Sequence, residues 1–302
     1  MAVRIAVAIV AGIVCTVAAA AMAAERSPAG GLATALADAG FAGREACRRS
    51  LEALPTDLMS ADDRNVVEHF HRSTTLHRRL PAETIQCEAT LLEFVLTKPE
   101  TLVDIWRVLG ISRVSLDPAG PGRWRLADGY GTVGLIHLLH HERRPTGGML
   151  VFHGRGGYTG SLAPKPLTGG CLLVVRYEQL VGRHGREAQR VDVEAFLEVD
   201  GLGLEVVTRT LQPLIIRSVA ANVHEICLFV GQFATAAGRN PAGMARLAEQ
   251  LPRTKPADRR MLVALAAGDK GTAPAEPVLD KDVGEELAAR WLTADDLDTI
   301  RR

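Results

Sequence analysis

The spacing of apolar residues changes twice along the chain, from helical periodicity to alternation and back to helical periodicity. In the first third, apolar residues recur every three or four positions, which predicts short amphipathic helices over 44–54, 60–70, 91–97 and 100–109. Ser60 precedes two aspartates, a pattern typical of a helix N-cap with an acidic first turn. Pro81 closes the early helical region, Pro99 separates the third and fourth helices, and Gly110 marks the end of the fourth.

The middle of the chain alternates apolar and polar residues between clear turn sequences. A short strand is predicted at 84–87, before the helix pair, and six strands follow it at 111–116, 123–126, 131–142, 149–155, 171–180 and 190–199. The segments between the six strands are short and rich in glycine, proline and aspartate. Because such short connections cannot cross over to make parallel pairs, we expect an antiparallel meander.

Helical spacing returns at 204–237, the longest periodic segment in the protein. Pro213 is expected to kink this helix or to mark the start of its longer half, which alone would span about 36 Å. Asn240 and Pro241 predict the start of another helix, and a shorter one is expected at 261–266. The last twenty residues, which include Trp291, either dock as amphipathic helices or fray.

Together these segments predict an α+β protein with a seven-stranded, curled antiparallel sheet wrapped on a long C-terminal helix. The order resembles that of the START-like (SRPBCC) helix-grip superfamily over roughly 81–237, in segments such as KPETLVDIWRVLGI, LADGYGTVGLIHLL and DVEAFLEVDGLGLEVVTRTLQPL. The resemblance implies a cavity between sheet and helix that holds a hydrophobic ligand, and some members of the superfamily carry out chemistry there. The expected organisation is a signal peptide (1–23), an N-terminal helical segment (24–80), the helix-grip domain (81–239) and a C-terminal helical extension with a tail (240–302).

The N-terminus has the pattern of a secretory signal peptide. Arg4 is followed by an uncharged apolar run over 5–21, and Ala21 and Ala23 form an A-x-A cleavage pattern. We therefore expect a periplasmic or secreted protein that is soluble after cleavage, with no later transmembrane segment. The alternative is an uncleaved N-terminus that anchors the protein to the membrane.

Composition narrows the range of partners. The chain has 35 Lys and Arg against 35 Asp and Glu, so it lacks the basic surplus that nucleic-acid binding requires. An exported protein can form disulfides, and Cys47, Cys87, Cys171 and Cys227 follow the predicted cleavage site. Cys47 and Cys87 are the pair that could join a helix to the first strand, whereas the other two lie in apolar segments and are expected to be buried. The sequence leaves the disulfide state open.

Polar residues within the predicted strands and the long helix are the candidate ligand contacts. If the strands joined near Pro145 pair symmetrically, His137 lies opposite His153 with His141 on the same face. The further candidates are a rim tyrosine, an arginine in an apolar strand and a histidine in the long helix, namely Tyr158, Arg176 and His224. Solvent exposure is the simpler explanation for each charged or imidazole side chain.

Motifs that specify a reaction are missing. His224 and Glu225 begin a zinc-protease pattern, but Leu228 stands where its second histidine belongs. The glycines over 154–160 have neither the dinucleotide spacing nor the ending of a phosphate-binding loop, and no nucleophile elbow is present. We therefore expect no catalytic residue, no metal and no cofactor.

Three hypotheses follow. The first is an exported protein that binds an apolar or amphipathic, lipid-like small molecule between sheet and long helix without chemistry. The second is an enzyme of the same fold that uses the sheet histidines for acid–base or metal chemistry. The third is an envelope structural protein that binds another protein through its N-terminal helices or C-terminal tail.

Overall fold

The computed structural model describes residues 43–159, 167–181, 187–200, 204–267 and 287–288, with side chains of the long helix described from residue 216 onward. The predicted signal peptide, the N-terminal anchor alternative and the tail around Trp291 lie outside the described residues.

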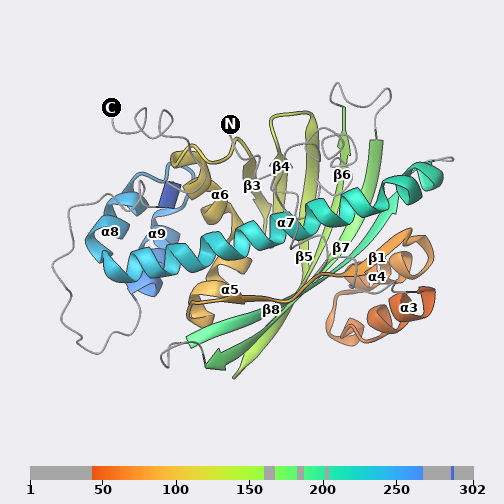
Figure 1. The fold of residues 1–302 in the computed structure, drawn as a ribbon, viewed down its shortest axis with the longest axis horizontal. Helices are drawn as coiled ribbons and strands as arrows, with labels where there is room; N and C mark the ends of the chain where they lie inside the picture. The colour runs from red at the N-terminus through yellow and green to blue at the C-terminus, as the bar shows by residue number, and fades with distance from the viewer. Residues whose placement is uncertain (1–42, 160–166, 182–186, 201–203, 268–286, 289–302) are drawn as a thin grey trace.

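An open, twisted antiparallel sheet of eight strands forms the centre of the molecule (Figure 1). Its strands are β1 (Leu76–Arg79), β2 (Glu83–Ile85), β3 (Ser115–Gly120), β4 (Arg123–Ala127), β5 (Thr132–Arg144), β6 (Gly147–Tyr158), β7 (Leu167–Val181) and β8 (Glu187–Val199). The spatial order β1-β8-β7-β6-β5-β4-β3 makes the six later strands consecutive neighbours. The antiparallel meander and the α+β class are therefore confirmed.

The expected count of seven strands was one too low. The additional strand is β1, which lies in the segment that we assigned to the N-terminal helical region. Both β1 and β2 pair with β8, so they form one edge of the sheet in two pieces, with Pro81 between them. Proline has no amide hydrogen to donate to a neighbouring strand, which explains why the edge is interrupted there.

Seven α-helices surround the sheet within the described residues: α3 (Arg44–Glu52), α4 (Ala61–Ser73), α5 (Ala89–Thr97), α6 (Pro99–Val108), α7 (Leu204–Arg239), α8 (Pro241–Glu249) and α9 (Pro256–Ala267). Two predicted N-caps are confirmed, because Ser60 accepts a hydrogen bond from the Asp63 amide and Asn240 accepts one from Gly243. The long helix α7 begins at Leu204, as predicted, and its helical backbone continues through Pro213.

The sheet separates two hydrophobic cores. On the inner face, strand residues such as Leu150 and Phe152 pack with the second half of α7 and with helices α5, α6, α8 and α9. On the outer face, the alternate residues Met149 and Val151 pack under α3 and α4. Figure 1 shows α7 running along the sheet, with α8 and α9 at one end and the α3–α4 pair near the other. The N-terminal helices therefore cover the face opposite the long helix.

One irregularity in β5 changes which face its side chains occupy. The pairing of β5 with β6 shifts by one residue between Leu138 and His140, as in a β-bulge. Before the shift, His137 lies on the outer face, where it contacts Asp63 of α4. After the shift, His141 lies on the inner face, where its Nε2 is 3.1 Å from a carboxylate oxygen of Glu93 in α5. The prediction that His141 shares a face with His137 was therefore wrong.

Candidate functional site

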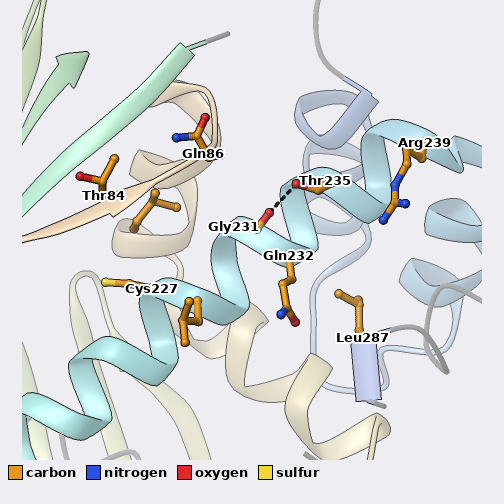
Figure 2. Close-up of a pocket in the computed structure, with 10 residues that line it drawn as sticks. Thr84, Gln86, Cys227, Gly231, Gln232, Thr235, Arg239 and Leu287 are labelled. Atoms are coloured by element: carbon orange, nitrogen blue, oxygen red, sulfur yellow. Dashed lines mark hydrogen bonds between the residues drawn. The ribbon is translucent and has the colours of Figure 1, made fainter. Parts of the chain in front are cut away.

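A pocket of about 600 Å³ lies on the inner side of the molecule, between β2 and the second half of α7. Figure 2 shows side chains from both elements around it, with Leu287 closing one side. Its lining consists of Thr84, Ile85, Gln86, Cys227, Leu228, Gly231, Gln232, Thr235, Arg239 and Leu287.

The sequence places helix and strand close together at this pocket. Gly231 has no side chain, and a Cβ atom there would lie 3.6 Å from Ile85 Cγ2 and 3.8 Å from the Gln86 amide nitrogen. One α-helical turn toward the N-terminus of α7, the Cys227 side chain also faces this space. Beyond it, His224 Nδ1 lies 2.9 Å from a carboxylate oxygen of Glu83 in β2. This contact ties helix to strand next to the pocket.

The lining combines apolar and polar side chains. Ile85 and Leu228 contribute hydrocarbon surface, while Gln86, Gln232 and Arg239 carry hydrogen-bonding groups. Such a mixture suits a ligand with an apolar body and a polar group, because a few polar side chains in a mostly hydrophobic cavity fix a ligand's orientation.

The pocket has little capacity for covalent chemistry. Burial raises the pKa of the Cys227 thiol to about 12, with a smaller contribution from the nearby Glu83 carboxylate. A thiol with that pKa stays protonated at neutral pH, so it is a poor nucleophile and a poor metal ligand. The Thr235 hydroxyl already donates to the Gly231 carbonyl at 2.9 Å (Figure 2). Neither the Cys227 thiol nor the Thr235 hydroxyl is therefore poised as a nucleophile.

The histidines that we singled out in the sheet lie elsewhere. His137 and His153 are directly opposite each other in β5 and β6, as the symmetric pairing predicted. Both project from the outer face under α4, where the Phe70 ring lies edge-on to the His153 ring at 5.9 Å. They therefore do not line the space between the sheet and α7. Successive side chains of a strand point to opposite faces of the sheet, and Phe152, next to His153 in β6, belongs to the inner core.

Arg176 also lies on the outer face. Its guanidinium is 3.2 Å from one carboxylate oxygen of Glu194, and His77 Nε2 is 2.7 Å from the other oxygen. Burial opposes ionisation of Glu194, but hydrogen bonds from His77 and Ser50 lower the pKa of this carboxyl to about 2. Arg176 thus balances a buried carboxylate of the protein itself, and it does not share a cavity with α7.

Of the remaining candidates, His224 is closest to the pocket. It is part of the Glu83 contact beside the lining, with about a third of its side chain exposed. Tyr158 is buried at the end of β6, between Thr132 of β5 and Leu167 of β7. The structure therefore disperses the five predicted contacts over both faces of the sheet, and a ligand-binding role for each stays a prediction.

A polar network on the outer face was missed by sequence reasoning. Glu198 of β8 is buried, and its carboxylate lies 2.7 Å from His69 Nε2 and 2.8 Å from a guanidinium nitrogen of Arg155. Arg155 also reaches Asp200 at 2.6 Å. His69 and Glu198 are 129 positions apart in the chain, and only the pairing of β6, β7 and β8 under α4 brings these residues together.

Metal binding and membrane spanning find no support in the described part of the chain. No group of three or more potential metal-ligating side chains occurs among those residues. No helix there combines the length and apolarity needed to cross a bilayer. The four cysteines after the predicted cleavage site are free thiols, and the predicted burial of Cys171 and Cys227 is confirmed.

Comparison with known proteins identifies no family. No family model matches the sequence, and no curated protein is significantly similar to it. Among solved structures, a conserved protein from Geobacillus kaustophilus aligns at 13% identity over 51% of this chain and 95% of its own, with a TM-score of 0.30. A Rhizobium loti protein aligns at 18% identity over 49% of this chain and 97% of its own, with a TM-score of 0.26.

The protein Ara h 8.0201 also aligns, at 12% identity over 49% of this chain and 97% of its own, with a TM-score of 0.26. Alignments with such low TM-scores do not establish a shared fold. The described topology, an open antiparallel sheet packed against one long helix, is consistent with a helix-grip fold on its own evidence.

Proposed function

We propose that this protein binds an apolar or amphipathic small molecule, without chemical conversion, in the pocket between β2 and α7. The observation that carries the proposal is the size and lining of that pocket, about 600 Å³ with hydrocarbon and hydrogen-bonding groups from both elements. Pockets of this volume accommodate drug-sized or lipid-like ligands. The raised pKa of the Cys227 thiol supports a binding role over a catalytic one.

The test fills the pocket with a larger side chain. Gln232→Trp replaces a lining amide with an indole, and we expect it to weaken binding of dodecanoate at least about tenfold by removing space for the chain. The matched control is Gln250→Trp at the exposed C-cap of α8, outside the lining, which should leave affinity unchanged. Isothermal titration calorimetry provides the affinities, and equal affinities for both variants would refute the proposed site.

The polar group of the ligand can be tested at Arg239. Because its guanidinium belongs to the lining, Arg239→Gln should weaken binding of dodecanoate but not of the uncharged dodecanol. Arg246→Gln on exposed α8 surface controls for the general loss of one positive charge. Equal losses for both ligands would show that Arg239 does not recognise an anionic head group.

The proposal includes export and a lipid-like ligand. Both rest on the N-terminal sequence pattern and on the mixed lining of the pocket. Native mass spectrometry of protein purified from the extracytoplasmic fraction tests them together. Loss of residues 1–23 with a co-purified lipid is the expected result, whereas an intact N-terminus in the cytoplasmic fraction would contradict export.

A further inference from the structure

A second hollow of about 620 Å³ lies on the outer face of the sheet, opposite the pocket beside α7. The helices α3 and α4 do not cover this part of the face, which is formed by β3 to β7 near the start of β5. Gly157 lies between Val133 of β5 and Thr168 of β7. Because glycine has no side chain, the surface of the sheet is hollowed at this position. We call this region the outer groove and define it by Arg125, Val133, Leu135, Arg155 and Gly157.

Two aliphatic side chains lie open in the outer groove. Val133 and Leu135 are two positions apart on β5, so they project from the same face, and each is 58% exposed. Large hydrophobic residues on the solvent side of a strand are individually common. Two neighbours in one hollow form a continuous apolar strip, which is a surface that a ligand can cover.

Charged side chains flank this strip in a single row across the sheet. Strand pairing places Asp117 next to Arg125, Arg125 next to Leu135, and Leu135 next to Arg155. The aliphatic side chain of Leu135 therefore lies between two guanidinium groups.

The described ion pairs of this row do not include the Arg125 guanidinium. Arg155 is engaged by the carboxylates of Glu198 and Asp200, at 2.8 and 2.6 Å. Asp117 is engaged by Arg253 at 2.8 Å. Arg125 forms no ion pair with any other described residue. The groove thus offers, at one side of an apolar strip, a guanidinium that belongs to none of these ion pairs, with Asp117 as its neighbour across the strands.

We propose that the outer groove is a second binding site, and that its ligand is a small amphipathic anion. The apolar part of the ligand covers Val133 and Leu135, and its anionic group pairs with the Arg125 guanidinium. Charge complementarity selects an anion over a cation or a neutral molecule, because a guanidinium pairs strongly with carboxylate, sulfonate and phosphate groups.

The test uses anilinonaphthalene sulfonate and its uncharged analogue N-phenylnaphthylamine as fluorescent probes. All variants carry Gln232→Trp, so that the pocket beside α7 is filled. Arg125→Gln should weaken binding of the sulfonate about tenfold and leave binding of the uncharged probe unchanged. Leu135→Gln should weaken binding of both probes severalfold, because both lose an apolar contact.

Two exposed positions outside the groove provide matched controls. Leu180→Gln on β7 and Arg260→Gln on α9 repeat the same chemical changes, and both should retain the parent affinities. Circular dichroism melts verify that each variant is folded.

Three results would overturn the proposal. The first is loss of all probe binding on Gln232→Trp alone, which would place every site beside α7. The second is an equal effect of Arg125→Gln and Arg260→Gln on the sulfonate. The third is a dimer in analytical ultracentrifugation that Leu135→Gln dissociates, because the groove would then be an interface between two copies of this chain.

Discussion

His153 lies in an environment that disfavours its protonated form. Burial lowers the pKa of this imidazole to about 4, and the Glu198 carboxylate only partly opposes that effect. His137, Arg155 and His69 add to the lowering because each would repel a second positive charge. With Phe70 packed edge-on against it, His153 functions at neutral pH as an uncharged aromatic residue of the outer core.

The low pKa of His153 predicts a loss of stability in mild acid. Below pH 6.5 the unfolded chain binds a proton at His153 that the folded protein does not bind until about pH 4. The contribution of this group to the free energy of unfolding is therefore greatest above pH 6.5. It decreases by up to about 1.4 kcal/mol per pH unit between those values.

His153→Phe keeps an aromatic ring against Phe70 and removes the titration. In urea unfolding at a series of pH values, the wild-type free energy of unfolding should fall more steeply than that of the variant from pH 6.5 to about pH 4. Parallel curves would show that His153 is protonated equally in both states.

At the scale of elements, the β5–β6 hairpin depends on close backbone contact. A Cβ atom at Gly147 would lie 2.2 Å from the carbonyl oxygen of Tyr177 in β7, far inside van der Waals contact. Moving β7 aside would cost considerable free energy, because the obstructing atom belongs to the backbone of a central strand. Glycine is therefore required at this position for reasons of space.

Gly147→Ala should consequently destabilise the protein by about 1–3 kcal/mol, the usual cost of overpacking. Gly43→Ala is the matched control, since a Cβ atom at that N-cap meets nothing within 4 Å, and it should cost less than about 1 kcal/mol. Thermal denaturation of both variants measures the difference, and similar melting temperatures would contradict the steric argument.

The elements themselves were largely predictable, because local signals define them. Ser60 and Asn240 identified helix starts, and the turn sequences identified six strands, although β3 begins at Ser115, four residues later than predicted. The bulge before His140 has no such signal, so the face of His141 was assigned incorrectly. The contacts of Glu198 escaped prediction because they join residues that only the assembled sheet brings together.

At the scale of the whole molecule, the sheet is a barrier between two sets of thiols. Cys47 packs beside the outer core, whereas Cys87, Cys171 and Cys227 belong to the inner core. The disulfide between Cys47 and Cys87 that the sequence allowed would have to join opposite faces of the sheet. The three inner thiols all have a pKa raised to about 12, mainly by burial.

Alkylation of the folded protein should therefore be selective. With Cys15 changed to Ser throughout, iodoacetamide at pH 8 should modify Cys47 first, because its side chain is only partly buried while the others are buried. Mass spectrometry should show one adduct in the native protein and none with Cys47→Ser. A peptide that links Cys47 to Cys87 would contradict the separation of the two faces.

The interruption at Pro81 affects whether another copy of this protein can add a strand to the edge of the sheet. An unbroken edge strand is a template on which another chain can add its own strand, and such addition leads to aggregates. Here the edge strand is divided into pieces of four and three residues, each too short to hold a foreign strand in register. The opposite edge, β3, contains Pro118 and a pairing irregularity beside it. Both edges of the sheet are thus poor templates for the addition of a strand from another copy.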